Sequence, residues 1–426
     1  MPRNCIPSTF RFISLINLMI LNFKQDRSSL TANEITQKTY KCDLWRGGFE
    51  GVLSSGAQTF CLFIAIRYFD AGEILKSLIA AAPFMGMFFS MVLLHYASST
   101  RWEKSAWGAL PSMITGLCLL LAAWTTSVHM FAFFVVIGYI CRSALLPFIT
   151  DIYGDNYPEK HRGAFFSKSL ILSVGMAALS GFVGSSILEK DIEYYPLIFT
   201  FLGFCAFFKA LAIYGMPSKS MDKSPHVNPF GNMKYAWQDR SFGYVLLTWF
   251  IMGFANLWTL PLRVDYITSP QWGIEGSAIF VAMIITVIPE TLRMLLIPFW
   301  ARQFDKMNFV VLRMILNLSF AAGVLLFFIS SNPWIIGAGS ALIGVAFAGG
   351  SIAWNLWVTK YAPPGKTGAY MSVHVSLTGI RGTLGPMIGY WAVGLIGAQN
   401  IGILSCLMMV LATLMLIPEI QHGRRK

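Results

Sequence analysis

Residues 158–184 read PEKHRGAFFSKSLILSVGMAALSGFVG, and residues 363–389 read PPGKTGAYMSVHVSLTGIRGTLGPMIG. The two stretches align without a gap at an offset of 205 residues, so that a proline, two glycines, an alanine, a serine and a leucine fall on identical residues. The same offset places Gly48-Phe49 on Gly253-Phe254. The chain therefore contains two copies of one unit in the same order, and a site shared by the copies is expected between them.

The composition excludes a soluble globular protein. Apolar residues make up 55% of the 426 residues and charged residues 12%, about half the usual charged share. These charged residues are too few and too unevenly placed to form the polar surface of soluble domains of this total length. The net charge of +12 lies mostly in short breaks between apolar runs, so we interpret it as a topology signal and expect no nucleic-acid partner. The seven cysteines are scattered singly, which predicts neither disulfides nor a metal site.

A helix needs about 20 apolar residues to cross the hydrocarbon layer of a membrane. Charged residues and turn residues divide this chain into twelve such runs. The predicted fold is therefore an all-α integral membrane protein with twelve transmembrane helices in two pseudo-symmetric six-helix bundles. The predicted spans are 47–66, 74–97, 106–125, 130–151, 164–188, 195–215, 242–264, 276–301, 309–330, 334–358, 367–396 and 400–417.

The basic residues predict the orientation of these spans. Most of them fall in the terminal segments and in the loops after even-numbered spans, whereas the opposite loops hold Arg67, Lys76, Lys190 and Arg263. Because basic loops remain on the cytoplasmic side, both termini are predicted to be cytoplasmic, with the protein in the cell (inner) membrane. The apolar stretch 12–23 is too short to span, and we interpret it as part of a cytoplasmic or interfacial segment rather than a signal peptide.

These predictions divide the chain into five parts. They are a cytoplasmic N-terminal segment at 1–46, a first bundle at 47–216, a cytoplasmic central loop at 217–241, a second bundle at 242–417 and a cytoplasmic tail at 418–426.

Several loops resemble those of the major facilitator superfamily. That family carries a Gly, three residues and Asp-Arg after its second span, and a second-half copy is recognisable in Ala301-Arg302-Gln303-Phe304-Asp305-Lys306. The first-half copy at 96–101 lacks both the Gly and the Asp. The segment 155–163 is similar to the loop before the fifth span, and Gly385-Pro386 is similar to the family's Gly-Pro motif. The opening segment 45–51 resembles bacterial members whose substrates are unassigned.

This resemblance implies a secondary active transporter that moves a small organic solute by alternating access of a central site to the two sides. The chain has no Gly-x-x-x-x-Gly-Lys-Ser/Thr loop, so we expect coupling to an ion gradient, as in proton symport, rather than to ATP. The expected partners are a small-molecule substrate, a coupling proton or other ion and the lipid bilayer. We expect a monomer that is not an enzyme and carries no cofactor and no metal.

Three other functions stay open from the sequence. The abundant aromatic residues, 15% of the chain, also suit an exporter of amphipathic drugs or metabolites. A solute sensor on a transporter scaffold is a more remote alternative, since such a protein normally adds a signalling domain. A membrane-embedded enzyme is equally remote, because the six histidines are dispersed and form no H-E-x-x-H pair.

Charged residues within the predicted spans are the first candidates for a substrate or coupling site, because each costs about 2.5 to 3.5 kcal/mol to insert at the bilayer centre. Counting along the helices places Arg142, Glu290, Arg293 and Arg381 nearer the middle of the membrane. The same count places Glu50, Lys168 and Lys209 near the interface, where we expect the lysines to extend to water and all three to be structural.

Glu290 and Arg293 are three residues apart and are expected to pair on one helix face. Pro289 predicts a local kink beside them. Glu290 is the best candidate proton carrier, with a purely structural ion pair as the alternative. Arg142 and Arg381 have no acidic neighbour in sequence. They either meet Glu290 across a central cavity or leave positive charge there for an anionic substrate.

Polar and aromatic residues of the seventh and tenth spans complete the candidate substrate surface, although such residues also serve helix packing. They are Asn256, Trp258, Trp354 and Asn355.

A second group of charges in the cytoplasmic loops is predicted to act as a conformational latch, because loop charges can pair differently as the halves move. These gating candidates are Arg101, Arg302, Asp305 and Lys306.

Overall fold

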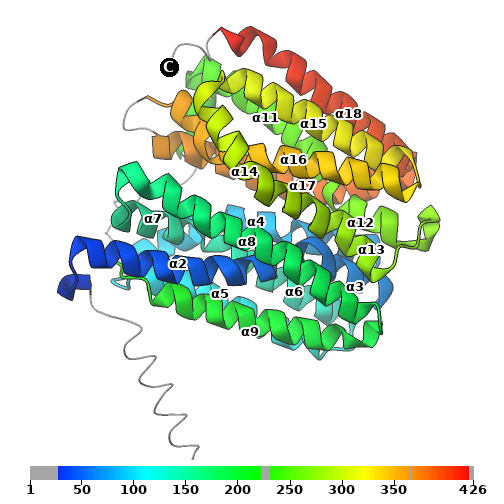
Figure 1. The fold of residues 1–426 in the computed structure, drawn as a ribbon, viewed down its shortest axis with the longest axis horizontal. Helices are drawn as coiled ribbons and strands as arrows, with labels where there is room; N and C mark the ends of the chain where they lie inside the picture. The colour runs from blue at the N-terminus through cyan, green and yellow to red at the C-terminus, as the bar shows by residue number, and fades with distance from the viewer. Residues whose placement is uncertain (1–26, 222–230, 364–366, 422–426) are drawn as a thin grey trace, which may run out of the picture.

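The computed structural model describes residues 27–221, 231–363 and 367–421, and within these ranges the protein is helical, with no β-strand beyond one isolated bridge. Figure 1 shows two helix bundles lying side by side, the N bundle in blue to green and the C bundle in green to red. The start of α2 and the end of α18 lie on the same side of the molecule (Figure 1), which we call the terminal face, and the opposite side is the far face.

The N bundle contains the first six crossings. The first is continuous through a π-helical segment, and the fourth is interrupted at Leu145, between α6 and α7, with Pro147 in the first turn of α7. In order, the elements are α2 (Ala32–Ser55), η2 (Gly56–Phe60), α3 (Cys61–Arg67), α4 (Glu73–Ser98), α5 (Lys104–Ala123), α6 (Val128–Ala144), α7 (Leu146–Asn156), α8 (Glu159–Leu188), η3 (Ile192–Tyr194) and α9 (Tyr195–Tyr214).

The C bundle contains the remaining six crossings, preceded by a short helical turn. In order, its elements are η4 (Gly231–Lys234), α10 (Tyr235–Gln238), α11 (Arg240–Leu257), α12 (Leu260–Thr268), η5 (Pro270–Trp272), α13 (Ala278–Ala282), η6 (Met283–Val287), α14 (Ile288–Lys306), α15 (Phe309–Ile329), α16 (Pro333–Leu356), η7 (Trp357–Lys360), α17 (Thr367–Ile396), α18 (Ala398–Met415) and η8 (Ile417–Ile420).

The predicted twelve-helix fold is confirmed. Among the described residues, eleven helical stretches are long and apolar enough to cross a membrane. The remaining predicted span, 367–396, is α17, a continuous helix of 30 residues that carries His374 and Arg381 among its apolar residues. The turn between α17 and α18 is the single residue Gly397, whose φ of 80° is one that residues with a side chain rarely adopt.

The first helix begins 15 residues before the predicted span at 47–66, because α2 starts at Ala32. Thr31 caps it: its side chain accepts from the Glu34 backbone, and the Glu34 carboxylate accepts from the Thr31 backbone N–H at 2.8 Å. This capping box satisfies two otherwise unpaired donors. Counting apolar residues found the membrane-spanning part of α2 and missed its polar first turns.

The helix boundaries follow the 205-residue repeat. Shifting α5 by 205 residues gives 309–328, which nearly coincides with α15, and shifting the start of α6 gives Pro333, the start of α16. The contacts between the bundles follow it too. They consist mainly of α4 on α17 and α8 on α14. A shift of 205 residues places α4 on α14 and α8 on α17, so the two contacts are equivalent under the repeat. The bundles are therefore related by a pseudo-two-fold axis that passes between them.

Glycines allow close helix contacts inside each bundle. A Cβ on Gly51 of α2 would lie 2.0 Å from the Ser173 carbonyl oxygen of α8, whereas a Cβ on Gly48 would meet only a Leu172 methyl at 3.9 Å. In the C bundle, Gly389 of α17 similarly faces the Trp258 backbone oxygen.

We expect Gly51→Ala to lower stability by about 1–3 kcal/mol, because the new methyl group would force α2 away from α8. Gly48→Ala, on the next turn of the same helix, is the matched control and should be nearly neutral. Thermal unfolding of both variants in detergent measures the difference. Equal melting temperatures would show that the α2–α8 contact is not as close as described.

Candidate transport cavity

A cavity of about 910 Å³ lies between the two bundles and is lined by residues of both. Its volume is within the range of small-molecule sites, roughly 300 to 1,000 Å³. Basic residues outnumber acidic ones in the lining by six to two. The charged lining residues are Arg46, Arg142, Arg162 and Lys209 with Glu50 from the N bundle, and Arg263 and Arg293 with Glu290 from the C bundle.

Glu50 of α2 forms the centre of the N-bundle side of the cavity. Its carboxylate accepts from Arg142 of α6 at 2.6 Å and from Lys209 of α9 at 2.5 Å. The expectation that Lys209 extends its side chain to water is therefore wrong, since Lys209 is only 1% exposed, and both Glu50 and Lys209 line the cavity. Arg142 pairs with Glu50 and not with Glu290. One carboxylate here faces two cations, which leaves an excess positive charge.

Glu290 of α14 is buried on the opposite wall of the cavity. The predicted pairing with Arg293 is confirmed, with Nη1 3.2 Å from Oε2. Gln58 of the N bundle also donates to Glu290, at 3.0 Å, so that this carboxylate joins the two bundles. Arg293 in turn donates to Ser351 of α16 at 3.0 Å. Glu290 therefore has one partner in its own bundle and one in the other bundle.

Two π-helical segments meet beside this contact. Gln58 lies in η2 and Thr286 in η6, and Thr59 and Thr286 share a hydrogen bond of 2.6 Å between the bundles. Pro289, which predicted an irregular helix, follows η6 directly at the start of α14. Such π-helical turns occur frequently at functional sites, because they rotate side chains out of the regular helical register.

Arg263 was assigned to a far-face loop by its position at the end of the span 242–264. The structure places it inside α12, 6% exposed and lining the cavity. Its only described hydrogen bond is a long one, 3.4 Å from Nη2 to Asn256 Oδ1, and it forms no ion pair with any described acidic residue. Arg46, by contrast, is paired with the buried Asp43 at 2.7 Å. Arg263 is thus the cavity cation that is held least by described protein groups and most available to bind a ligand.

Four predicted substrate residues lie outside the cavity lining. Asn256 and Trp258 are buried in the C bundle, where Trp258 donates to Ser405 of α18. Trp354 lies against the ring of His374, with centroids 5.3 Å apart. Arg381 donates to the Trp249 carbonyl and does not reach Glu290. The side chain of Asn355 is outside the described part of the structure.

The bundles are joined at the far face. Lys76 of α4 pairs with Asp265 of α12 at 2.8 Å, and both side chains are nearly buried. The same carboxylate accepts from Ser269, Gln271 and Trp272 at 2.9 to 3.3 Å. Nearby, Arg67 donates to the Gly276 carbonyl and the Ile279 N–H donates to Glu189. Asp265 was not singled out in the sequence, because it falls just after a predicted span.

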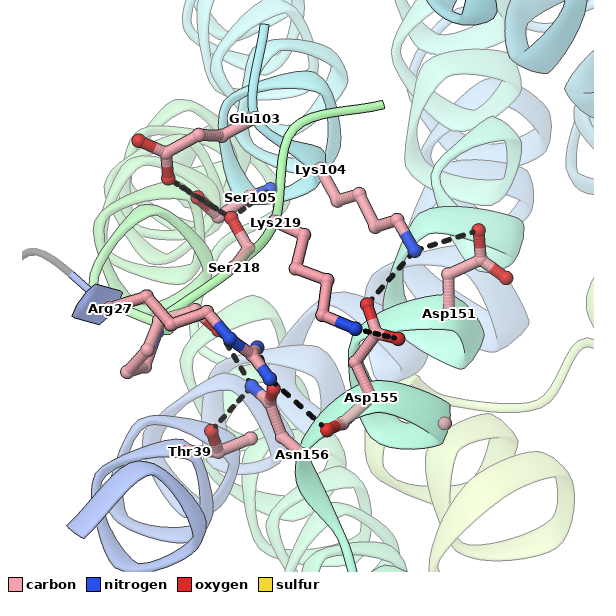
Figure 2. Close-up of polar contacts among 12 residues, drawn as sticks. Arg27, Thr39, Glu103, Lys104, Ser105, Asp151, Asp155, Asn156, Ser218 and Lys219 are labelled. Atoms are coloured by element: carbon pink, nitrogen blue, oxygen red, sulfur yellow. Dashed lines mark hydrogen bonds and ion pairs between the residues drawn. The ribbon is translucent and has the colours of Figure 1, made fainter. Parts of the chain in front are cut away.

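At the terminal face, the described hydrogen bonds stay within single bundles. Figure 2 shows Asp155 at the end of α7 paired with Lys104 at 2.9 Å and Lys219 at 3.5 Å, all in the N bundle. Arg27 donates to the Asp155 carbonyl and to Asn156 in the same group. The cavity lining reaches this face at Arg162 and Gly163.

The predicted latch residues at the terminal face lie apart from these contacts. Arg101, Arg302 and Lys306 are exposed and form no ion pair with a described acidic residue. The side chain of Asp305 lies outside the described residues.

These features define a multi-pass membrane protein with two repeated six-helix bundles around a central cavity that is closed at one face. A family model of the Major Facilitator Superfamily matches residues 51–374, and the chain belongs to this family. A comparison with curated protein sequences finds no match.

Solved structures share the fold. A POT family transporter in complex with 5-aminolevulinic acid has a TM-score of 0.71 at 13% identity, covering 91% of this chain and 96% of that one. A D-xylose-proton symporter has a TM-score of 0.70 at 15% identity, covering 91% and 98%. The human organic anion transporter MFSD10 has a TM-score of 0.62 at 16% identity, covering 90% and 99%.

We expect Asp265→Asn to open the far face, because Lys76 then loses its ion pair between the bundles. The measurement is the distance between spin labels on Lys190 and Glu275, two exposed residues at that face, one in each bundle. The distribution should broaden toward longer distances. Asp155→Asn breaks ion pairs inside one bundle and serves as the control. A distribution unchanged by Asp265→Asn would refute the role of this ion pair in closing the face.

Proposed function

We propose that this protein is a secondary transporter that carries a small polar or anionic organic solute through the cavity between its bundles by alternating access. The observation that supports this most directly is the cavity itself, lined by both repeats and closed at the far face by Lys76–Asp265. In a repeat-built carrier, rocking of one bundle against the other exposes a central site to each side in turn.

The excess of basic residues favours a substrate with an anionic group. Arg263 lacks an acidic partner among the described residues, and Arg142 and Lys209 share the single carboxylate of Glu50. A carboxylate or phosphate on the substrate would compensate these charges with charge-assisted hydrogen bonds. The same cavity has apolar walls that include Leu62, Phe84 and Phe347, which would contact the organic part of the molecule.

The orientation follows from the distribution of basic residues. Under the positive-inside rule the terminal face is cytoplasmic, in the cell membrane, and the conformation described here faces the cytoplasm. In the opposite conformation the terminal face closes, and Arg101, Arg302, Asp305 and Lys306 become the latch that the sequence predicts.

We assign proton coupling to Glu290. It accepts from Gln58 across the bundle interface and from Arg293 within its own bundle. Rocking of the bundles would separate Glu290 from Gln58, so this carboxylate would have different hydrogen-bond partners in the two conformations. The proton would then be taken up in one conformation and released in the other.

The apolar walls of the cavity also suit the alternative function, export of amphipathic compounds. The two functions differ in ligand chemistry, so a binding screen separates them.

Organic anions should stabilise the purified protein in detergent, because a ligand of the native state raises its apparent stability. We expect Arg263→Gln to weaken this binding about tenfold to a hundredfold, as expected for the loss of a charged hydrogen bond. Arg240→Gln removes the same charge from an exposed position outside the cavity and should leave binding intact. A thermal-shift titration measures both. Stabilisation by hydrophobic cations alone would favour export instead.

Glu290→Gln should abolish the pH dependence of uptake into proteoliposomes, since glutamine keeps the shape of the side chain and cannot carry a proton. Glu275→Gln, at an exposed far-face position, is the matched control. Uptake that keeps its pH dependence in Glu290→Gln would remove Glu290 from the coupling mechanism and leave the transport proposal itself standing.

A further inference from the structure

A group of cationic and aromatic side chains is buried inside the C bundle, apart from the lining of the central cavity. Arg313 of α15 lies over the ring of Trp249, with its guanidinium carbon 3.6 Å from the ring centroid. Arg381 of α17 donates to the backbone carbonyl of the same Trp249. His374 packs edge-on against Trp249 and Trp357, with centroids 5.1 and 5.2 Å away. We call these five residues the C-bundle cationic cluster.

The cluster contains several polar groups without a partner. Among the described residues, Arg381 Nε, both ring nitrogens of His374 and the indole N–H groups of Trp249 and Trp357 have no hydrogen-bond partner. All five residues are at most 5% exposed. Buried polar groups are normally satisfied, and a concentration of unsatisfied groups at one place indicates an unseen water or ion.

The two arginines also lack a counter-charge. Neither forms an ion pair with an acidic residue in the described ranges, and their other hydrogen bonds go to neutral groups, Met252 and Thr378. The stacking of Arg313 on Trp249 offsets part of the cost of burial. Water would satisfy the unpaired N–H groups, but it would not neutralise two guanidinium charges inside a membrane protein.

We propose that the C-bundle cationic cluster binds a small inorganic monovalent anion of halide size. Such an anion accepts hydrogen bonds from many directions, so it suits unpartnered donors that come from α11, η7 and α17 beside Arg313 of α15. The stacked rings of Trp249 and Trp357, with centroids 5.4 Å apart, favour a small spherical ion over an organic acid. The bound anion joins four elements of the C bundle and stabilises them as one body.

The test compares melting temperatures of the full-length protein in sodium gluconate, chloride and bromide at constant ionic strength. We expect chloride and bromide to raise the melting temperature of the natural protein by a few degrees in a saturable manner. Arg381→Met, which keeps the length of the side chain without its charge, should lose this dependence. Arg263→Gln removes another buried, unpaired arginine, in the central cavity, and should retain it.

Each alternative outcome contradicts the proposal. Absence of a saturable halide effect in the natural protein would show that the cluster holds water and no anion. A halide effect lost in Arg263→Gln and kept in Arg381→Met would place the anion in the central cavity. If Arg381→Met does not fold, bromide-soaked crystals of the natural protein decide the question, since an anomalous peak between Arg313, Arg381 and His374 is required. Because organic-anion binding is measured separately, either result leaves the transport proposal intact.

Discussion

Pairing of charges inside the membrane is the constraint on which this structure depends. A carboxylate or guanidinium within the hydrocarbon layer must be neutralised or hydrated, and three groups of described charges meet this requirement by pairing within the protein. Glu50, with two cations around it, holds three helices of the N bundle together. Glu290 lies where the bundles meet and has partners in both. Lys76 and Asp265 seal the far face between them.

The placement of these pairs indicates which contacts persist and which break when the bundles move. The Glu50 contacts and the Asp155 contacts lie inside one bundle, so they persist when the bundles move relative to each other. The Gln58–Glu290 and Lys76–Asp265 contacts cross between bundles and must break if the far face opens. Packed interfaces of this kind have discrete arrangements rather than continuous ones, which is the physical basis for two alternating conformations.

Much of the fold could be predicted, because the membrane imposes a length and a polarity on each span. The boundaries of α5 and α15 and the contact pairs α4–α17 and α8–α14 agree with the repeat offset. The site could be predicted less well. Depth along a helix placed Glu50 and Lys209 at the interface, but a water-accessible cavity reaches them from the side of the bundle. The same count placed Arg381 nearer the middle of the membrane, yet its side chain turns toward Trp249 and away from the cavity.

The sequence by itself determined the membrane-spanning helices, their order, the internal repeat and the Glu290–Arg293 pair, because all of these depend on local composition and on spacing along one helix. Only the tertiary structure decided which charges share a cavity. Arg142 and Glu50 are 92 residues apart, and Lys76 and Asp265 are 189 apart. Their pairing depends on the rotation of each helix about its axis and on the packing of one bundle against the other, which no single span encodes.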